Sequence, residues 1–493
     1  MFICHFVYIN ILFGKNHAVR VDEYNQRITA TFSCTDDLII RPLTIGGKSA
    51  LLVFLDGGSD KTLLDRDVIA PLLQLENLDE PHLNAIQNTI KYCEQTKPVQ
   101  VEKSPQNIAE GDVALIIDED ENAYIFSLRN AEKRSIAEPP TESVMKGPRE
   151  GFIEEIKSNL SLIRRRLKTP ALAVKTLKVG RYSSTSVAVL HIDGIADDKI
   201  VREITEKISK IDVDGVIDSA YVISFIQPKK HSFFLQAGTT EKPDVAAAKL
   251  LEGRVLILVD GSPIAITLPY LIFEDVQDGY DYYSEDWRAS LIRVFRLLGA
   301  LLTVLLPGAY VALQTFHYSL LPLKFLTTLL AATNGIPFPP AIEMLIVLVL
   351  FEILNQASIR MPRYFGISLS VVGAIVLGDT AVKSGLISSP SVLVIALSAI
   401  GIFCVPDQVG TMSILRLLFL LVSAVLGFVG IVILLIITVG YLASLENFGT
   451  PYLAPYAPRI NPDLKDGFLK VGDAEMNTRP YSIPTANVKR SAK

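Results

Sequence analysis

The chain has 493 residues, a net charge of −5 and four cysteines. Such a charge gives no reason to expect a nucleic-acid partner. Hydrophobic residues make up 49% of the chain although 20% are charged, as expected if a charged soluble part precedes an apolar part. The cysteines lie far apart without a CxxC pair, so the sequence predicts neither a disulfide framework nor a zinc site.

Residues 1–35 are predicted to be an N-terminal extension. Their apolar start, MFICHFVYINILFG, lacks the basic region and the small-residue cleavage site of a signal peptide. The apolar run is also too short to span a bilayer. We therefore expect a strand or a short helix here.

Residues 36–137 and 170–285 are predicted to form two related α/β lobes of a soluble region. In each, a glycine turn joins two apolar strands, and an Asp-Gly turn with a further aspartate leads into an amphipathic helix. An apolar hairpin follows, at 111–129 and at 253–269. The shared order of elements indicates an internal duplication.

The acidic turns of the two lobes have a structural and a chemical interpretation. Asp56-Gly57 and Asp60 in the first lobe correspond to Asp193-Gly194 and Asp197 in the second. Two carboxylates could bind a metal ion, but Asp-Gly is common turn chemistry and aspartate is a common helix cap. The turn and cap roles are therefore preferred, and no metal or cofactor site is predicted. Because no nucleotide-binding loop or nucleophile–base pair is apparent, the chain is not expected to be an enzyme.

Residues 138–169 are predicted to be a linker followed by a bracing helix. Prolines break the first part, and from Phe152 onward apolar residues recur at helical spacing. Arg164, Arg165 and Arg166 lie at the end of this helix, where positive charge favours the helix dipole. We expect the helix to brace the two lobes; the alternative is a basic contact for anionic lipid or for a partner.

Aromatic and basic residues precede the first apolar span. The candidate membrane-interface anchors are Tyr282, Tyr283, Trp287, Arg293 and Arg296. Aromatic rings suit the headgroup layer, and arginines flank spans on the cytoplasmic side. The N-terminal region is therefore expected to be cytoplasmic. Glu343, a few residues into a later helix, is expected to reach the headgroups.

Residues 286–446 are predicted to form an all-α polytopic membrane domain with about five transmembrane helices, four or six being the alternatives, followed by a C-terminal tail at 447–493. Apolar segments lie near 294–316, 341–359, 366–383, 390–405 and 414–443, at or near the roughly 20 residues that span a bilayer. The last would be about 45 Å long as one helix, so we expect it to tilt or bend near Gly427 and Gly430. Pro307 and Gly308 predict a kink or a break in the first span.

The candidate pore or gating residues are Glu352, Ser370, Gly373, Leu377 and Asp379. A carboxylate within a span is costly and usually faces the bundle interior or an aqueous path. Glu352 and Asp379 therefore line a conduction path or form interhelical hydrogen bonds. The other three residues share one stripe of the small-residue helix 366–383. This stripe favours tight packing over pore lining, although a symmetric assembly could make both true.

Several ordered motifs are similar to those of a known family. They include EPPTE, KGPREGF, IDVDG, TTEKPD, PGAYVAL, FEIL, IRMP and FGTPYLAP. Over about 36–475 the chain resembles the A subunit of GerA-type nutrient germinant receptors of endospore-forming bacteria. The resemblance implies a subunit of the spore inner membrane that works with a transporter-like B subunit and a lipoprotein C subunit. It also implies a homo-oligomer, a pentamer, whose channel releases ions when the partner senses a nutrient.

The sequence departs from the family pattern inside the membrane domain. The family has Arg-Glu-Ala-Gly where this chain has Asn355-Gln356-Ala357-Ser358. It has glutamine where this chain has Asp379. These changes bear on ion selectivity and gating. The alternative function is an accessory stage V sporulation AF-like protein, or a non-conducting scaffold that clusters receptors. A secondary transporter would need inverted repeats, whereas the duplication lies in the soluble region.

Overall fold

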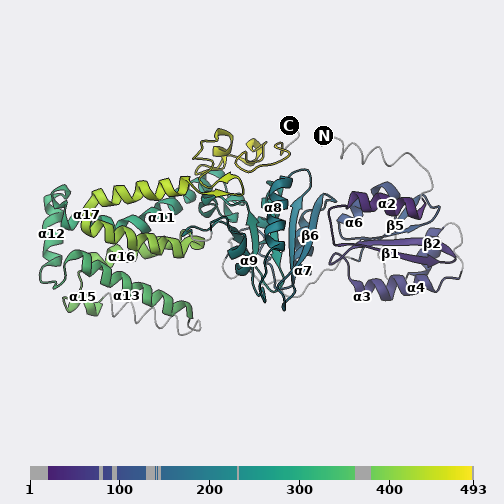
Figure 1. Cartoon of the computed structure of the whole chain (residues 1–493), viewed down its shortest axis with the longest axis horizontal. Helices are drawn as coiled ribbons and strands as arrows, with labels where there is room; N and C mark the ends of the chain where they lie inside the picture. Colours follow the sequence, from purple (N-terminus) through teal and green to yellow (C-terminus); the bar gives the residue numbers. More distant parts are fainter. Residues whose placement is uncertain are drawn as a thin grey trace.

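Two β-sheet lobes and a helical region follow one another along the long axis of the molecule (Figure 1). The computed structural model describes residues 20–76, 82–90, 97–128, 139, 142, 146–229, 232–360 and 379–490. Lobe 1 (residues 20–128) lies at one end and the helical region at the other, with lobe 2 (residues 146–268) between them. The predicted fold class, two related α/β lobes followed by an all-α membrane region, is confirmed.

Lobe 1 is a five-stranded antiparallel sheet with helices on both faces. Its elements are α2 (Val21–Thr31), β1 (Leu38–Ile45), β2 (Lys48–Leu55), α3 (Lys61–Leu63), α4 (Ala70–Leu73), α5 (His82–Thr89), β3 (Lys97–Gln100), α6 (Ser104–Ala109), β4 (Val113–Ile117) and β5 (Asn122–Phe126). The strand order is β1-β2-β4-β5-β3. α2 and α6 pack on one face, and the segment from α3 to α5 packs on the other.

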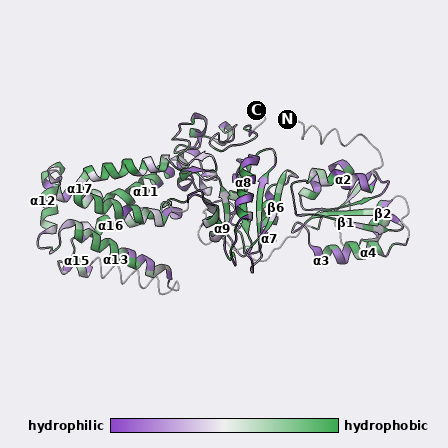
Figure 2. Ribbon diagram, viewed as in Figure 1, coloured by the Kyte–Doolittle hydropathy of each residue, from purple (hydrophilic) through white to green (hydrophobic). Residues whose placement is uncertain are grey.

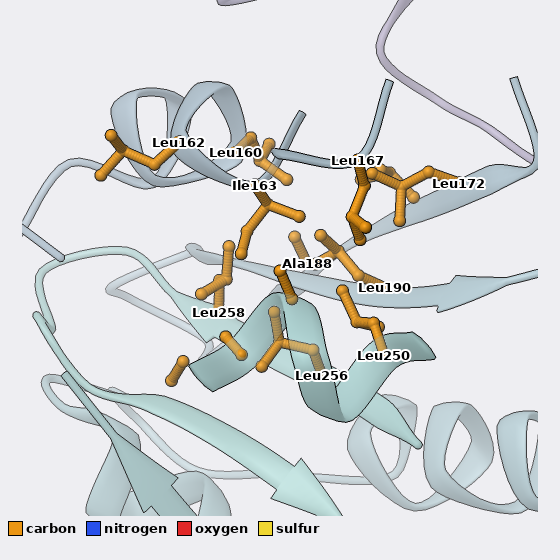
Figure 3. Close-up of a cluster of buried hydrophobic side chains, with 14 of the residues drawn as sticks. Leu160, Leu162, Ile163, Leu167, Leu172, Ala188, Leu190, Leu250, Leu256 and Leu258 are labelled. Carbon is orange, nitrogen blue, oxygen red and sulfur yellow. The ribbon is translucent and has the colours of Figure 1, made fainter. Parts of the chain in front are cut away.

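Lobe 2 repeats this plan. Its elements are α7 (Ile156–Arg166), β6 (Leu172–Val179), β7 (Thr185–Ile192), α8 (Asp198–Ser209), α9 (Ser219–Ile226), β8 (Gly238–Thr240), α10 (Pro243–Leu251), β9 (Val255–Val259) and β10 (Ala265–Leu268). The strand order, β6-β7-β9-β10-β8, is that of lobe 1. Ile163 of α7 packs with Leu190 and Leu256 of the sheet (Figure 3). The predicted duplication is confirmed by this common order.

The acidic turns stand at equivalent positions in the two lobes. Asp60 caps α3 by accepting hydrogen bonds from the Thr62 and Leu63 amides at 2.9 and 3.1 Å. Asp197 caps α8 by accepting from the Lys199 amide at 2.8 Å. The turn and cap interpretation therefore accounts for these aspartates.

Each lobe begins with a helix that precedes its first strand and packs into its core. Tyr24 and Ile28 of α2 are buried in the core of lobe 1, just as α7 is buried in lobe 2. We therefore propose to begin lobe 1 at α2 instead of residue 36, and lobe 2 at α7. The polar sequence of α2, with few apolar positions, left this helix unrecognised within the predicted extension.

A buried ion pair joins the two lobes. Arg164 of α7 donates from Nε and Nη2 to the two carboxylate oxygens of Asp37, both at 2.8 Å, and from Nη2 to Thr35 Oγ1 at 2.9 Å. The Asp36 amide donates to the Val174 carbonyl at 2.8 Å. Because Arg164 is buried by this junction, it braces the lobes and is not available for lipid contact.

The helical region contains α11 (Asp286–Thr315), α12 (Leu323–Thr333), α13 (Pro340–Arg360), α15 (Ala381–Lys383), α16 (Ser389–Ile402) and α17 (Val409–Ala443). Among the described residues, three segments are long and apolar enough to span a membrane: 286–315, 340–357 and 406–443. Figure 2 shows hydrophobic residues dominating these helices, whereas the lobes mix hydrophobic and hydrophilic residues. The predicted helix 366–383 lies mostly outside the described residues.

α17 reverses direction at Gly427. The φ of +60° and ψ of −145° at this residue belong to a region essentially restricted to glycine. Leu415 and Leu442 share one buried cluster, whereas in a straight helix they would lie about 40 Å apart. A Cβ on Gly430 would lie 2.9 Å from the Val422 carbonyl oxygen. The predicted bend is thus a loop-free hairpin of two helical segments.

Both ends of the helical region consequently meet lobe 2. Tyr283, before α11, donates to Asp244 of lobe 2 at 2.7 Å, and Asn447, after α17, donates to the Gln236 carbonyl of lobe 2. A chain whose two soluble ends lie on one side of a membrane crosses it an even number of times. The count of about five crossings stays a prediction, and of the counts open from the sequence, four and six would place both ends on one side.

α11 is continuous through Pro307 and Gly308. The helix therefore does not break there, and the kink stays a prediction. A Cβ on Gly308 would lie 3.0 Å from the Phe419 carbonyl oxygen of α17. This glycine thus permits the close approach of α11 and α17.

Replacing Arg164 by alanine tests the junction between the lobes. Arg164→Ala leaves Asp37 buried without its counter-ion, which should lower the free energy of unfolding by about 3–5 kcal/mol. The exposed pair of Arg165 and Glu150 provides the control, because Arg165→Ala should cost about 1 kcal/mol or less. Urea unfolding of the purified protein, read by protease cleavage between the lobes, measures both. Equal urea midpoints for the two variants would contradict the assignment.

Replacing Gly427 by alanine tests the hairpin. Gly427→Ala should destabilise the protein by about 1–3 kcal/mol, because a side chain is strained at this φ and ψ and its Cβ would approach His317 at 3.0 Å. Gly440→Ala, in the same helix with nothing within 4 Å of its Cβ, should be tolerated. Thermal unfolding in detergent compares them. A continuous helix would instead be stabilised by both substitutions.

Candidate functional site

A buried ion pair lies inside the helical region. Arg416 of α17 donates from Nη2 to Glu352 of α13 at 3.2 Å and from Nη1 to Ser398 of α16 at 3.3 Å. The Arg416 side chain is 1% exposed, whereas that of Glu352 is 34% exposed. Sequence reasoning singled out Glu352 but missed Arg416. The sequence does mark Arg416, because it is the one basic residue in the apolar run ILRLLFLL.

The second half of α13 carries polar side chains that the described part of the chain covers only in part. Gln356, one turn after Glu352, is exposed, and Asn355 is partly exposed. Gln356 Nε2 lies 3.5 Å from Glu352 Oε1. Within a bilayer such a surface is unfavourable against lipid, so it requires cover or water.

Glu343 is buried, and the expectation that it reaches the headgroups is wrong. Its Oε1 accepts from the Ser388 amide at 2.6 Å and from Ser388 Oγ at 2.7 Å. Ser388 is the N-cap of α16, so the carboxylate of Glu343 anchors the start of that helix to α13. The carboxylate satisfies both donors of Ser388 through one oxygen.

The remaining predicted pore residues are not brought together with Glu352 by the described part of the chain. Asp379 forms an exposed ion pair with Lys383, one helical turn away, at 2.7 Å. Ser370, Gly373 and Leu377 lie outside the described residues. Among the predicted pore residues that the structure describes, Glu352 is therefore the one that pairs with a buried charge.

The junction between lobe 2 and the helices, here called the collar, comprises residues 270–296, 406–411 and 444–470. Arg293 is fully buried there, with Nε 2.9 Å from Asp281 Oδ2 and Nη1 2.9 Å from Asp466 Oδ1. Arg296 lies 2.8 Å from the same Asp281 oxygen. Arg293 is thus enclosed by protein and is not a headgroup anchor as predicted, and Arg296 shares its carboxylate.

The aromatic candidates of the collar have different surroundings. The Tyr282 hydroxyl donates to Asp466 Oδ2 at 2.7 Å, and the Tyr283 hydroxyl donates to Asp244 Oδ2 of lobe 2 at 2.7 Å. Trp287 is 67% exposed and remains a predicted membrane-interface anchor. The two tyrosines therefore also tie the collar together.

A second polar cluster connects two segments of the collar, the one before α11 and the one at the start of α17. Tyr270 donates its hydroxyl hydrogen to Asp275 Oδ1, and Gln408 Nε2 donates to Asp275 Oδ2 at 2.8 Å. Burial is the main cause that raises the pKa of Asp275 to about 7. The charge of this contact therefore responds to pH near neutrality.

A polar pocket of about 370 Å³ lies between the lobes. Lys61 and Lys157 contact Asp56 there at 2.6 and 3.1 Å. Burial raises the pKa of Asp56, but the hydrogen bonds from these two lysines outweigh it and hold the pKa below its usual value. Within the described ranges, no three His, Cys, Asp or Glu side chains are grouped so that they could hold a metal ion.

The sequence is similar to known spore germination proteins. Spore germination protein KA of Bacillus subtilis (strain 168) is 35% identical over 468 residues, which cover 93% of this chain and 86% of that protein. Spore germination protein GerLA of Bacillus cereus is 32% identical over 470 residues, which cover 94% and 95%. The uncharacterized membrane protein YfkQ of B. subtilis (strain 168) is 33% identical, covering 95% and 92%.

A solved structure and a family model also match. The structure is the crystal structure of the N-terminal domain of the A subunit of the Bacillus megaterium spore germinant receptor GerK3. It is 28% identical, with a TM-score of 0.41, and covers 52% of this chain and 98% of that chain. The model described as Bacillus/Clostridium GerA spore germination protein matches residues 26–482. Because that match covers most of the sequence, the chain belongs to the GerA family of spore germination proteins.

Proposed function

We propose that this chain is the channel-forming A subunit of a nutrient germinant receptor in the spore inner membrane. Several copies, a pentamer by the family resemblance, would surround an ion path between their helical regions. The path would open when a transporter-like B subunit, assisted by a lipoprotein C subunit, senses a nutrient. The observation that carries this proposal is the partly exposed carboxylate of Glu352, which is paired with the buried Arg416.

Glu352 lies deep in its helix. It follows the start of α13 by about 18 Å at the helical rise, and its side chain is 34% exposed even with Arg416 paired to it. A charged group at such depth faces a bundle interior or an aqueous path and avoids lipid. A ring of copies that turns this side of α13 toward a shared path supplies that environment.

Gating would be a shift between closed and open populations. A partner opens the path only if it binds the open arrangement more tightly than the closed one. The collar supports a route for this coupling, because it contacts lobe 2, the start of α11 and both ends of α17. The N-terminal lobes would lie on the cytoplasmic, spore-core side together with the C-terminal tail.

Replacing Glu352 by glutamine tests the ion path. Glu352→Gln leaves the Arg416 charge buried without its partner. For a partly screened pair, the free-energy cost is about 1–3 kcal/mol. We therefore expect nutrient-triggered release of monovalent cations from spores to change by about fivefold or more. Glu23→Gln, at an exposed carboxylate of α2 that pairs with Arg27, is the control and should release cations normally.

Protein abundance in the spore membrane decides how the Glu352→Gln result is interpreted. Unchanged release at normal abundance would contradict the channel proposal. It would leave the accessory AF-like protein or the receptor-clustering scaffold as the function.

Replacing Asp379 by asparagine tests the second carboxylate. The exposed pair with Lys383 contributes about 1 kcal/mol or less to stability, so Asp379→Asn should not lower protein abundance. If Asp379 lines the cation path, the rate or the ion selectivity of release changes. Release that matches the unaltered protein in both respects would remove Asp379 from the path.

A further inference from the structure

Helix α9 of lobe 2 is apolar on both sides. Its eight residues, SAYVISFI, bury Val222 and Ile226 in the core. On the other side, Tyr221 and Phe225 are 46% and 37% exposed, four residues apart. Large apolar side chains that are exposed together often mark a surface that contacts a partner or a membrane. We therefore expect another surface to cover the outer side of α9.

Phe233 is a third exposed aromatic residue and follows the end of α9 by seven residues. It is 61% exposed, and its carbonyl accepts from Thr411 Oγ1, in the first turn of α17, at 2.5 Å. Lys229, which follows α9, donates from Nζ to the Ser444 carbonyl, just after α17, at 3.3 Å. The segment that carries these residues is thus bonded to both ends of a membrane-spanning hairpin.

We propose that Tyr221, Phe225 and Phe233, the aromatic patch, lie in the headgroup layer of the bilayer. The patch adjoins the level at which α17 enters and leaves the membrane, where aromatic side chains are favoured. It would act as an interfacial helix whose apolar side rests on the acyl boundary. Lipid would then help the collar to fix the orientation of lobe 2.

The size of the patch favours lipid over a protein partner. Stable protein interfaces use about 20–30 residues on each side, whereas the patch offers three side chains. The continuity of the patch with α17 also places lipid beside it whatever other chains assemble around the helical region. This proposal does not depend on ion conduction, so it and the channel proposal fail separately.

Fluorescence quenching by lipid tests the patch in the full chain. The single tryptophan of the protein, Trp287, is first replaced by phenylalanine, and Phe225→Trp is then introduced. Nanodiscs of phosphatidylcholine are prepared with and without bromine on the acyl chains. The brominated lipid should reduce the emission about twofold or more, as for an aromatic ring at the membrane interface.

A matched variant in lobe 1 provides the control. Leu73→Trp places the reporter on an exposed residue of α4, in the lobe farthest from the helices (Figure 1), and its emission should be the same in both lipids. Phe233→Trp repeats the test within the patch, in case Phe225→Trp fails to assemble.

Two outcomes would overturn the proposal. Unquenched emission with the red maximum of a hydrated ring would mean that the patch faces water. Unquenched emission with a blue-shifted maximum would mean that protein, such as a second copy of the chain, covers it.

Discussion

Arg293 is fully buried between lobe 2 and the helices, and its charge has to be matched there. Its guanidinium group reaches Asp281, Asp466 and the Gly467 carbonyl. Removing one partner of such a pair costs about 3–5 kcal/mol because the other charge stays buried. Since Asp281 precedes α11 and Asp466 follows α17, this requirement brings both ends of the helical region together. The reversal of α17 and the return of the C-terminal tail satisfy that same constraint.

The collar and the ion pair in the bundle belong to one connected structure. Gln408 contacts Asp275 of the collar, and Arg416 follows it by about two helical turns. Arg416 in turn holds Glu352. A displacement of lobe 2 that moves the start of α17 therefore reaches the carboxylate of α13 through packed elements with direct contacts. This is a physical route for coupling, whose use in gating depends on two states of the collar.

Local patterns in the sequence predicted the features that local chemistry determines. The Asp-Gly turns at Asp56 and Asp193 marked the duplication because turn geometry depends on neighbouring residues. The reversal at Gly427 was foreseen only as a bend, since apolar length does not distinguish a long helix from two short ones. The sequence predicts Arg293 as a lipid anchor, since one of its partners, Asp466, lies 173 residues away. Its burial depends on tertiary contact, which spacing does not reveal.

Water access to position 352 is the most direct test of the central claim that this side of α13 faces an aqueous path. The four native cysteines are replaced by alanine, and Glu352→Cys is treated in membranes with a membrane-impermeant thiol reagent. Ile353→Cys, at an exposed apolar position on the same helix, reports a side turned toward lipid. The account predicts rapid modification at position 352 and little at 353. Equal protection of both positions would contradict it.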